Sequence, residues 1–181
     1  DSTGKSSTKI ASGTNGGPTL ADVDYFGTSV TSVGDLDGDG INELAVGAKG
    51  DGPARGAVHV LFMNADGTVK SSTMIASGTS NGPTLADNDR FGRSVTSVGD
   101  LNGDGINDLA VGANFDDTGG AALHRGAVHV LLPDVDQDGP ATVKSHTTIA
   151  TGTDSGPPLA AAEALGRSMQ SADAPIRRGR R

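Results

Sequence analysis

The sequence predicts an all-β protein made of β-propeller blades, each blade a four-stranded antiparallel sheet. The first observation is composition: 28 glycines and 8 prolines are scattered along the chain, and aromatic residues make up only 3%. Short apolar runs separated by turn-favouring residues are typical of many short strands. The second observation is that no window shows the 3.6-residue period of a long helix. The third is an internal repeat.

One long segment occurs twice in the chain. FGTSVTSVGDLDGDGINELAVGAKGD begins at Phe26, and FGRSVTSVGDLNGDGINDLAVGANFD begins at Phe91. A third copy begins at Leu165 and departs from the pattern after Ser171. The second copy is longer because of two insertions at Gly/Asp-rich points, which is where surface loops tolerate extra residues.

Each complete unit is predicted to contain four strands. The first unit has them at Ser29–Val33, Glu43–Ala48, Ala57–Phe62 and Thr73–Ala76. The second has them at Ser94–Val98, Asp108–Ala113, Ala127–Leu132 and Thr147–Ala150. Short apolar strands suit sheets that are buried on both faces. Four such strands per unit, repeated, is the pattern of a β-propeller.

The repeat divides the chain into two complete blades with partial blades at both ends. The predicted parts are residues 1–25 (the outer strand of a preceding blade, at 8–11, and a connecting loop), 26–90 (blade 1), 91–164 (blade 2), 165–172 (the first strand of a partial blade) and 173–181 (a basic tail, expected to be disordered). Known propellers have roughly four to eight blades. We therefore expect either a homo-oligomer that completes a ring, most simply a trimer, or a longer chain of which this is a fragment.

The loop between the first two strands of each unit is predicted to bind one Ca²⁺. The first loop, DLDGDGINE, has carboxylates at positions 1, 3, 5 and 9, and Gly40 at position 6 permits a sharp reversal. Alternate side chains then converge on one point, and five or six oxygen ligands suit Ca²⁺ better than Mg²⁺. The predicted ligands are Asp35, Asp37, Asp39, the Ile41 carbonyl and Glu43, and in the second loop Asp100, Asn102, Asp104, the Ile106 carbonyl and Asp108.

Two other interpretations of these loops were weighed. An EF-hand shares the Asp-Gly core but needs a bidentate Glu at position 12 and helices on both sides. Position 12 is Val46 or Val111 and the flanks are strand-like, so this interpretation fails. A turn that binds no metal is the other alternative, and repulsion among unneutralised carboxylates argues against it.

A third acidic loop, with Asp134, Asp136 and Asp138, is interpreted as a polar hairpin loop. A weak third calcium site is the alternative. Thr142 at its position 9 is a poor ligand, and Pro140 changes the turn.

Several residues recur at equivalent places in both units and need an interpretation. Phe26 and Phe91 are predicted to pack between blades, with stacking on a ligand as the alternative. His59 and His129 are interpreted as packing or surface residues. The remaining pairs, Asp22 with Asp24 and Asp87 with Asp89, are interpreted as solvated loop acids, with lining of the face opposite the calcium loops as the alternative.

Charge and composition exclude several classes of protein. The formal net charge is −8, with 22 acidic and 14 basic residues, which argues against nucleic acid as the main partner. The absence of cysteine excludes a disulfide framework. No apolar stretch approaches the length of a membrane span. No Ser/His/Asp arrangement recurs at a distinctive spacing, so we expect no enzymatic activity.

The string FG…VGDLDGDGINELAVGA resembles the FG-GAP repeat of integrin α-subunit propellers and their bacterial relatives, and the likeness extends over residues 8–171. The chain departs from the family at Lys49 and Asn114, where the family name expects Pro, and in the collapsed third repeat. The resemblance implies one blade per repeat, with calcium held by the ten residues named above. It also implies a secreted or cell-surface location.

The most consistent function is an extracellular, calcium-binding, non-catalytic propeller module that acts in adhesion or in binding a protein or glycan ligand. Two alternatives stay open. One is the propeller segment of a polysaccharide-degrading enzyme, which would need Arg, Tyr and His in one cleft, whereas the only tyrosine is Tyr25. The other is a structural spacer at a surface.

Overall fold

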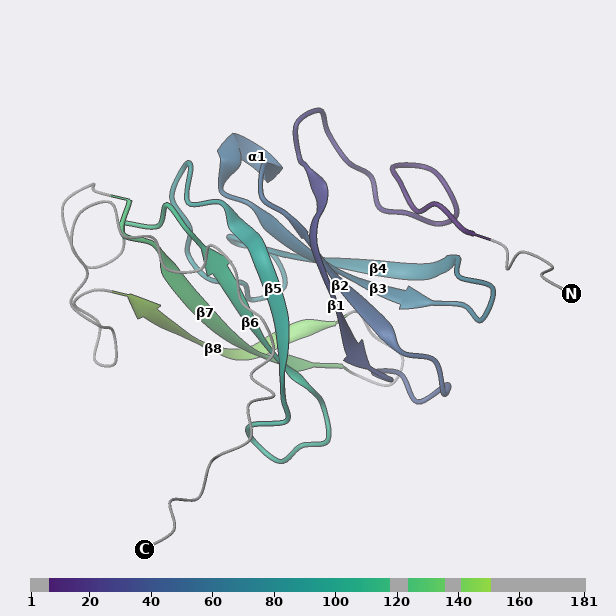
Figure 1. Ribbon diagram of the computed structural model, residues 1–181. Helices are drawn as coiled ribbons and strands as arrows, with labels where there is room; N and C mark the ends of the chain where they lie inside the picture. The colour runs from purple at the N-terminus through teal and green to yellow at the C-terminus, as the bar shows by residue number, and fades with distance from the viewer. Residues whose placement is uncertain (1–6, 118–123, 136–140, 151–181) are drawn as a thin grey trace, which may run out of the picture.

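A computed structural model describes residues 7–117, 124–135 and 141–150 and contains two four-stranded antiparallel sheets (Figure 1). The first sheet consists of β1 (Phe26–Gly34), β2 (Glu43–Ala48), β3 (Ala57–Met63) and β4 (Val69–Ala76), and the second of β5 (Phe91–Gly99), β6 (Asp108–Ala113), β7 (Ala127–Asp134) and β8 (Thr142–Ala150). In each sheet the strands pair in the order of the sequence. The predicted all-β fold with two four-stranded blades is confirmed.

The outer strands are longer than predicted. The strand β4 begins at Val69 and β8 at Thr142, whereas Thr73 and Thr147 were the predicted starts. Their added residues are mostly polar and exposed, which is what an edge strand with one solvated side shows. The apolar pattern used for the prediction therefore missed these residues.

Residues 8–11, predicted as an outer strand, form no strand in the structure. Ala11 makes only an isolated bridge with Thr14, as Ala76 does with Thr79 at the end of β4. An outer strand pairs with a third strand of its own blade, and the described chain has none before residue 26. Ile10 packs instead on the outer face of blade 1. The predicted strand at 165–172 and the tail at 173–181 lie outside the described residues.

The main core lies between the two sheets. It joins buried side chains of both blades, including Val33 and Val60 from the first and Phe91, Val95 and Leu109 from the second. Phe91 is fully buried, so the prediction that it packs between blades is confirmed. Its counterpart Phe26 is half-buried and packs with the smaller cluster on the other face of blade 1.

Glycines allow the two blades to touch backbone to backbone. A side chain on Gly47, near the end of β2, would collide with the carbonyl oxygen of Gly92 in β5. A side chain on Gly92 would in turn collide with the carbonyl oxygen of Ala57. Ser29 Oγ donates a hydrogen bond to the Gly92 carbonyl at 2.9 Å and adds a polar contact across the seam. The Phe-Gly and Val-Gly-Ala strings of the repeat therefore form the contact between neighbouring blades.

The remaining regular element is α1 (Asp51–Ala54), a short turn between β2 and β3 in which Gly52 and Pro53 have non-helical backbone angles. Within the described ranges, no helix has the length and apolar character that crossing a membrane requires.

Candidate metal centres

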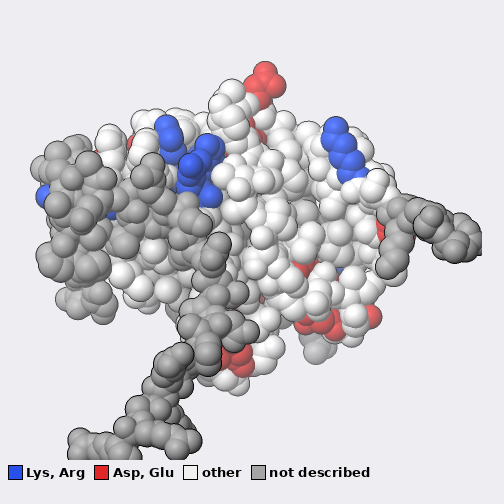
Figure 2. All heavy atoms as spheres, in the orientation of Figure 1, with Lys and Arg blue, Asp and Glu red and all other residues white. Residues whose placement is uncertain are grey.

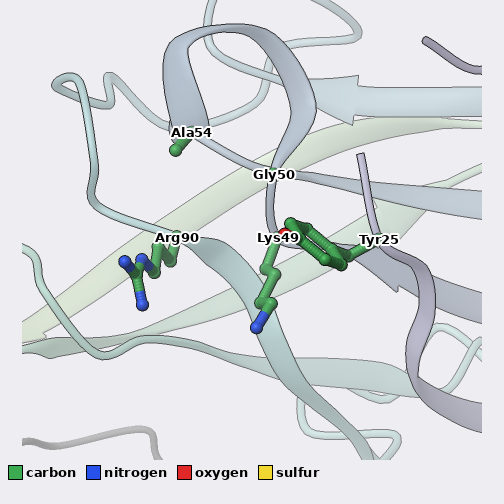
Figure 3. Close-up of a pocket in the computed structure, with 5 residues that line it drawn as sticks. All are labelled: Tyr25, Lys49, Gly50, Ala54 and Arg90. Atoms are coloured by element: carbon green, nitrogen blue, oxygen red, sulfur yellow. The ribbon is translucent and has the colours of Figure 1, made fainter. Parts of the chain in front are cut away.

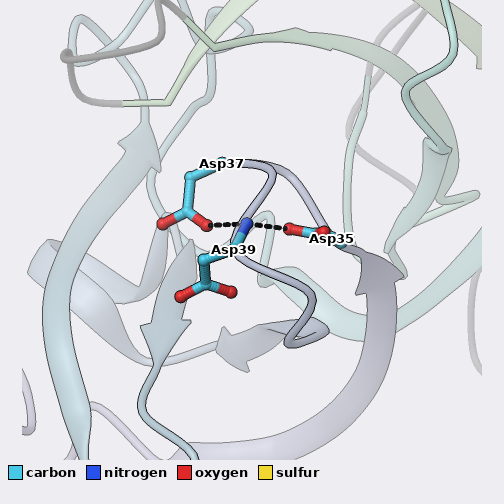
Figure 4. A group of neighbouring side chains, drawn as sticks. All are labelled: Asp35, Asp37 and Asp39. Atoms are coloured by element: carbon cyan, nitrogen blue, oxygen red, sulfur yellow. Dashed lines mark hydrogen bonds between the residues drawn. The ribbon is translucent and has the colours of Figure 1, made fainter.

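The loop between β1 and β2 brings three carboxylates together. One oxygen from each of Asp35, Asp37 and Asp39 lies within 4.8 Å of the other two (Figure 4). The Asp35 carboxylate accepts backbone N–H groups from Gly38 at 2.8 Å and from Gly40 at 2.8 Å, so it fixes the turn while facing its neighbours. Gly40 has a φ of 85°, which confirms the reversal expected at position 6.

Glu43 is the predicted ligand at position 9, and backbone hydrogen bonds hold its carboxylate in place. It is fully buried and accepts backbone N–H groups from Leu36 at 2.7 Å and from Met63 at 3.4 Å. Burial raises the pKa of its carboxyl, and the nearby Asp37 charge adds to that effect. A buried carboxylate beside other carboxylates is stabilised when a cation balances the charge.

Lys70, on β4, is the positive charge that the structure places against this loop. Its Nζ lies 2.6 Å from Asp37 Oδ2 and also pairs with Asp39. These contacts hold the pKa of Lys70 well above its usual value, and the hydrogen bond from Lys70 is the main cause of a lowered pKa for Asp39. The carboxylates thus form a cluster that attracts a cation, and Lys70 partly meets that demand.

The loop between β5 and β6 repeats this geometry with one substitution. Asp100 accepts N–H groups from Gly103 at 2.7 Å and from Gly105 at 2.8 Å, as Asp35 does in the first loop. These hydrogen bonds, chiefly that from Gly105, lower the pKa of Asp100. Asn102, at position 3, donates to Asp104 Oδ2 at 2.9 Å. The amide nitrogen of Asn102 thereby contacts the neighbouring carboxylate, and its amide oxygen accepts the Asp104 N–H at 2.9 Å, so Asn102 adds no charge to the loop.

Asp108, the predicted ligand at position 9 of the second loop, has one carboxylate oxygen paired and one unpaired among the described residues. Its Oδ2 accepts the Leu101 N–H at 2.7 Å, whereas its Oδ1 is buried without a hydrogen-bond partner in the described chain. The equivalent oxygen of Glu43 accepts the N–H of Met63, but Pro133 stands at that place in β7 and has no N–H. A buried carboxylate oxygen without a partner is costly unless a cation or a donor reaches it.

The remaining predicted ligands are positioned as follows. The Ile41 N–H donates to Asp39 Oδ1 at 2.8 Å, and the Ile106 N–H donates to Asp104 Oδ1 at 2.9 Å. These bonds orient the carboxylates at position 5. That the Ile41 and Ile106 carbonyls act as ligands stays a prediction. In the third acidic loop, Asp134 ends β7, and Asp136 and Asp138 lie outside the described residues.

The donor set of both loops fits a hard divalent cation. Carboxylate, amide and carbonyl oxygens are the ligands that Ca²⁺ takes, and the first loop offers four carboxylates and the second three. A cation held in each loop would neutralise the repulsion among its carboxylates. It would also link β1 to β2 in the first hairpin and β5 to β6 in the second. The residues present therefore fit the predicted metal.

The interpretation of Asp24 and Asp89 as solvated acids was wrong. These residues are 5% and 4% exposed, and each accepts the N–H of the residue three positions earlier, at 2.6 Å for Asp24 and 2.7 Å for Asp89. They fix the turn that leads into the first strand of each blade. Their neighbours Asp22 and Asp87 are exposed as expected. In a single sequence, the Asp-x-Asp spacing gave no sign that the second aspartate of each pair is buried.

The two histidines that recur in both units, His59 and His129, are buried, and each contacts a phenylalanine ring. His59 packs edge-on against Phe26 with 5.5 Å between ring centroids, and His129 does the same with Phe91 at 5.4 Å. His129 also pairs with the buried Asp116, with 3.2 Å between Nε2 and Oδ2. Their interpretation as packing residues is therefore confirmed.

Comparison with known proteins identifies the repeats. Residues 26–61 and 91–131 match the model of the FG-GAP repeat. The chain is 32% identical to integrin alpha-4 of Xenopus laevis over 93 residues, 51% of this chain and 9% of that protein. It is 37% identical to integrin alpha-3 of Cricetulus griseus over 115 residues, 60% of this chain and 10% of that protein. Integrin alpha-5 of Xenopus laevis is 38% identical over 105 residues, 56% of this chain and 9% of that protein.

The two blades are therefore FG-GAP repeats, and the chain is similar over these repeats to integrin alpha subunits. It spans about a tenth or less of the length of the relatives that it matches. Each matched segment begins at the Phe-Gly of a blade and ends in its third strand. The family signature thus covers the acidic hairpin and the seam glycines but not the outer strand.

Proposed function

We propose that this chain is a calcium-binding, non-catalytic β-propeller module that acts in extracellular adhesion or ligand binding. The observation that carries the proposal is the convergence of Asp35, Asp37 and Asp39 on one point, within 4.8 Å. The orphaned, buried Oδ1 of Asp108 supports an equivalent centre in the second blade. The ligand set is Asp35, Asp37, Asp39, Ile41 and Glu43 in the first loop and Asp100, Asn102, Asp104, Ile106 and Asp108 in the second.

A setting outside the cell suits the proposed cation. The calcium sites of extracellular modules have dissociation constants of about 10⁻⁴–10⁻³ M and are filled at the calcium concentrations found there. The likeness to integrin alpha subunits supports the same setting and a role in binding a protein or glycan ligand.

Most Asp and Glu atoms visible in Figure 2 lie toward the lower edge, where the β1–β2 and β5–β6 loops lie in Figure 1, and most Lys and Arg atoms lie toward the upper edge.

The alternative of a polysaccharide-degrading enzyme gains no support from the described residues. Tyr25 does line a pocket with Lys49 and Arg90, but no histidine lines it. Both blade histidines point into the packing of their own sheets. The chemistry that this alternative needs is therefore not assembled there.

The open ends of the two-blade unit favour completion of a ring. Val33 in β1 is 1% exposed because it faces blade 2, whereas its equivalent in β5, Val98, is 40% exposed. Conversely Val95 in β5 is 6% exposed, and its equivalent in β1, Val30, is 55% exposed. The same apolar position is buried at the seam and open at the ends. We infer that further blades, from other copies or from a longer chain, cover these faces.

Thermal unfolding with and without calcium tests the proposed function. Metal that binds only the folded state stabilises it by about 2.7 kcal/mol per site at 100 times Kd. We expect the melting temperature to rise on addition of Ca²⁺ and to fall on addition of EDTA. A melting temperature that responds to neither would contradict calcium binding.

A pair of variants makes this test specific. Asp37→Asn removes one carboxylate from the first loop, and Asp22→Asn removes the same charge from an exposed loop outside it. The first should reduce the calcium-dependent rise in melting temperature and the second should leave it unchanged. An equal effect of both would show that only overall charge matters.

A further inference from the structure

A pocket lies at the end of the blades opposite the calcium loops. Tyr25 immediately precedes β1 and Arg90 precedes β5, while Lys49 immediately follows β2. The calcium loops follow the other end of β1 and β5, so the sheet separates the two sites. The pocket has a volume of about 240 Å³ and is lined by Tyr25, Lys49, Gly50, Ala54 and Arg90; we call it the Tyr25 pocket (Figure 3).

The Tyr25 pocket concentrates positive charge in an acidic protein. Lys49 Nζ lies 4.9 Å from the centroid of the Tyr25 ring, and Arg90 lies across the hollow with its guanidinium carbon 4.1 Å from the centroid of the Phe115 ring (Figure 3). Arg93 adds a third positive charge that acts on Lys49. Within the described chain, none of these three cations forms an ion pair with a carboxylate. Burial lowers the pKa of Lys49, and the two arginines lower it further.

The backbone around the pocket is held in an unusual conformation. Tyr25, Ala54 and Arg90 all have positive φ, at 55°, 57° and 60°, which costs a residue with a side chain about 1–2 kcal/mol. Such strain persists where the surroundings impose it, and it gathers at binding sites. Here hydrogen bonds from Arg90 N–H to Ala54 O at 3.0 Å and from Gly50 N–H to Asp24 O at 3.0 Å fix both walls. The backbone that carries the side chains of the pocket is therefore fixed by its own hydrogen bonds.

The aromatic wall narrows the class of ligand. The Tyr25 side chain is 60% exposed, and Val23 beside it is 68% exposed, so an apolar surface lies open next to the cations. A small, open pocket of this volume falls below the usual range for larger ligands and suits one ring-sized unit. Tyrosine offers an apolar ring face together with a polar hydroxyl. Lysine and arginine are the natural partners of carboxylate and sulfate oxygens.

We propose that the Tyr25 pocket binds one anionic sugar unit, with its carboxylate or sulfate group paired to Lys49 and Arg90 and its ring packed on Tyr25. The proposal rests on the proposed ligand-binding function and names its ligand class. Because the sheet separates this pocket from the calcium loops, the ligand contacts no metal. Charge attraction makes the binding sensitive to salt.

Calorimetry at low ionic strength on the calcium-loaded protein tests the proposal with three probes: trigalacturonic acid, a sulfated disaccharide and neutral maltotriose. We expect an anionic probe to bind and the neutral one to bind at least about tenfold more weakly, as the loss of a charged hydrogen-bond partner implies. Binding of either anionic probe supports the proposal, and the tighter one identifies the preferred acid group. Maltotriose bound as tightly as both acids would overturn it.

Variants locate the binding. Lys49→Gln and Arg90→Gln should each weaken the anionic probe by about tenfold. Lys144→Gln removes the same charge from the exposed surface of β8 and should change nothing. Tyr25→Phe should retain binding and Tyr25→Ala should lose it. Equal affinity in the wild type and the Lys49→Gln/Arg90→Gln double variant would overturn the proposal.

Two further outcomes separate this proposal from the function on which it rests. A calcium-stabilised protein that binds neither anionic probe contradicts the Tyr25 pocket alone. A protein that binds the anionic sugar but gains no stability from calcium contradicts the proposed calcium role and leaves the pocket standing. An acidic peptide such as tetraglutamate that binds about tenfold more tightly than both sugars would overturn the assignment to sugars.

Discussion

Lys70 Nζ lies 2.6 Å from Asp37 Oδ2, on the side of the first acidic loop where three carboxylates converge. The Lys70 ammonium and the proposed calcium ion would therefore compete for the same oxygens. In the second blade the equivalent residue, Lys144, forms no ion pair among the described residues. Asn102 occupies the position in the second loop that Asp37 occupies in the first. The two hairpins thus have similar backbone hydrogen bonds, but only in the first does a lysine pair with the carboxylates of the loop.

We predict that Lys70→Gln tightens calcium binding by the first loop. The ammonium competes for Asp37 and Asp39, and ion pairs at exposed sites are weak, so the expected gain is about two- to fivefold in Kd. Calorimetric titration of the variant measures it. Lys144→Gln is the matched control and should leave both constants unchanged. A weaker first site would mean that Lys70 organises the carboxylates for the metal instead of competing with it.

The two loops should differ in calcium affinity. The first has four carboxylates and the second has three with Asn102, and affinity rises with ligand charge. Calorimetry on Asp104→Ala leaves the first site to be measured, and Asp39→Ala leaves the second. We expect the first site to bind more tightly, by a margin that widens when Lys70→Gln is added. Equal constants in both backgrounds would contradict the charge argument.

Asp89 should make the protein less stable as the pH rises from 4 to 6. Burial is the main reason that its pKa rises from 3.8 to about 6, with the charges of Asp116 and Asp117 adding to the effect. The folded state then holds the proton more tightly than the unfolded state, so stability is lost as the pH passes from 3.8 to 6.

The variant Asp89→Asn tests this pH dependence because its amide oxygen can still accept the Ala86 N–H. Relative to the variant, the wild type should lose at most about 3 kcal/mol of unfolding free energy across this window. Comparing urea unfolding of the two proteins cancels the titration of the acidic loops. Asp87→Asn, at an exposed neighbouring position, should show no such difference. Parallel pH profiles for the wild type and Asp89→Asn would refute the prediction.

Gly27 and Gly92 give a matched test of the seam. Both have positive φ, at 86° and 82°, but a side chain would meet nothing within 4 Å at Gly27, whereas at Gly92 it would meet the Ala57 carbonyl. Gly27→Ala should therefore cost about 1–2 kcal/mol from backbone strain alone. Gly92→Ala should cost about 1–3 kcal/mol more because the blades are forced apart. Similar unfolding free energies for the two variants would contradict a tight seam.

The exposed valines at the two ends predict assembly. If copies of this chain close a ring, light scattering should show a particle of three times 18.0 kDa, which would contain six blades. Val30→Asp places a charge on the open face and should produce monomers, whereas Leu101→Asp, in an exposed loop, should not. A stable wild-type monomer would exclude the trimer and leave completion by a longer chain.

The sequence predicted the strands that carry apolar alternation and the loops that carry alternating oxygen donors. Both depend on local patterns that repeat, which is why β2 and β6 were placed at their observed bounds. Contacts between distant segments were beyond its reach. Lys70 lies far along the chain from Asp37, and Pro133 affects Asp108 only because β7 pairs with β6.

The same limit applies to the opposite end of the blades. Tyr25, Lys49 and Arg90 belong to three separate segments, and no spacing connects them until the sheets are stacked. Asp24 and Asp89 look like surface acids in a polar loop, and only the fold shows that the turn encloses them. The sequence pattern therefore predicted where the acidic loops lie and missed the cationic pocket.

The backbone contact of Gly47 with Gly92 gives the repeat a property of interlocking parts. The Val-Gly-Ala string of one blade forms half of a joint, and the Phe-Gly string of the next forms the other half. Each repeat thus contributes its Val-Gly-Ala string to the contact with the next blade and its Phe-Gly string to the contact with the preceding one. Among the described residues, Gly27 has no neighbouring blade to contact. An added or deleted whole repeat would keep both halves of each contact, so this architecture can change its number of blades while reusing the same backbone contact.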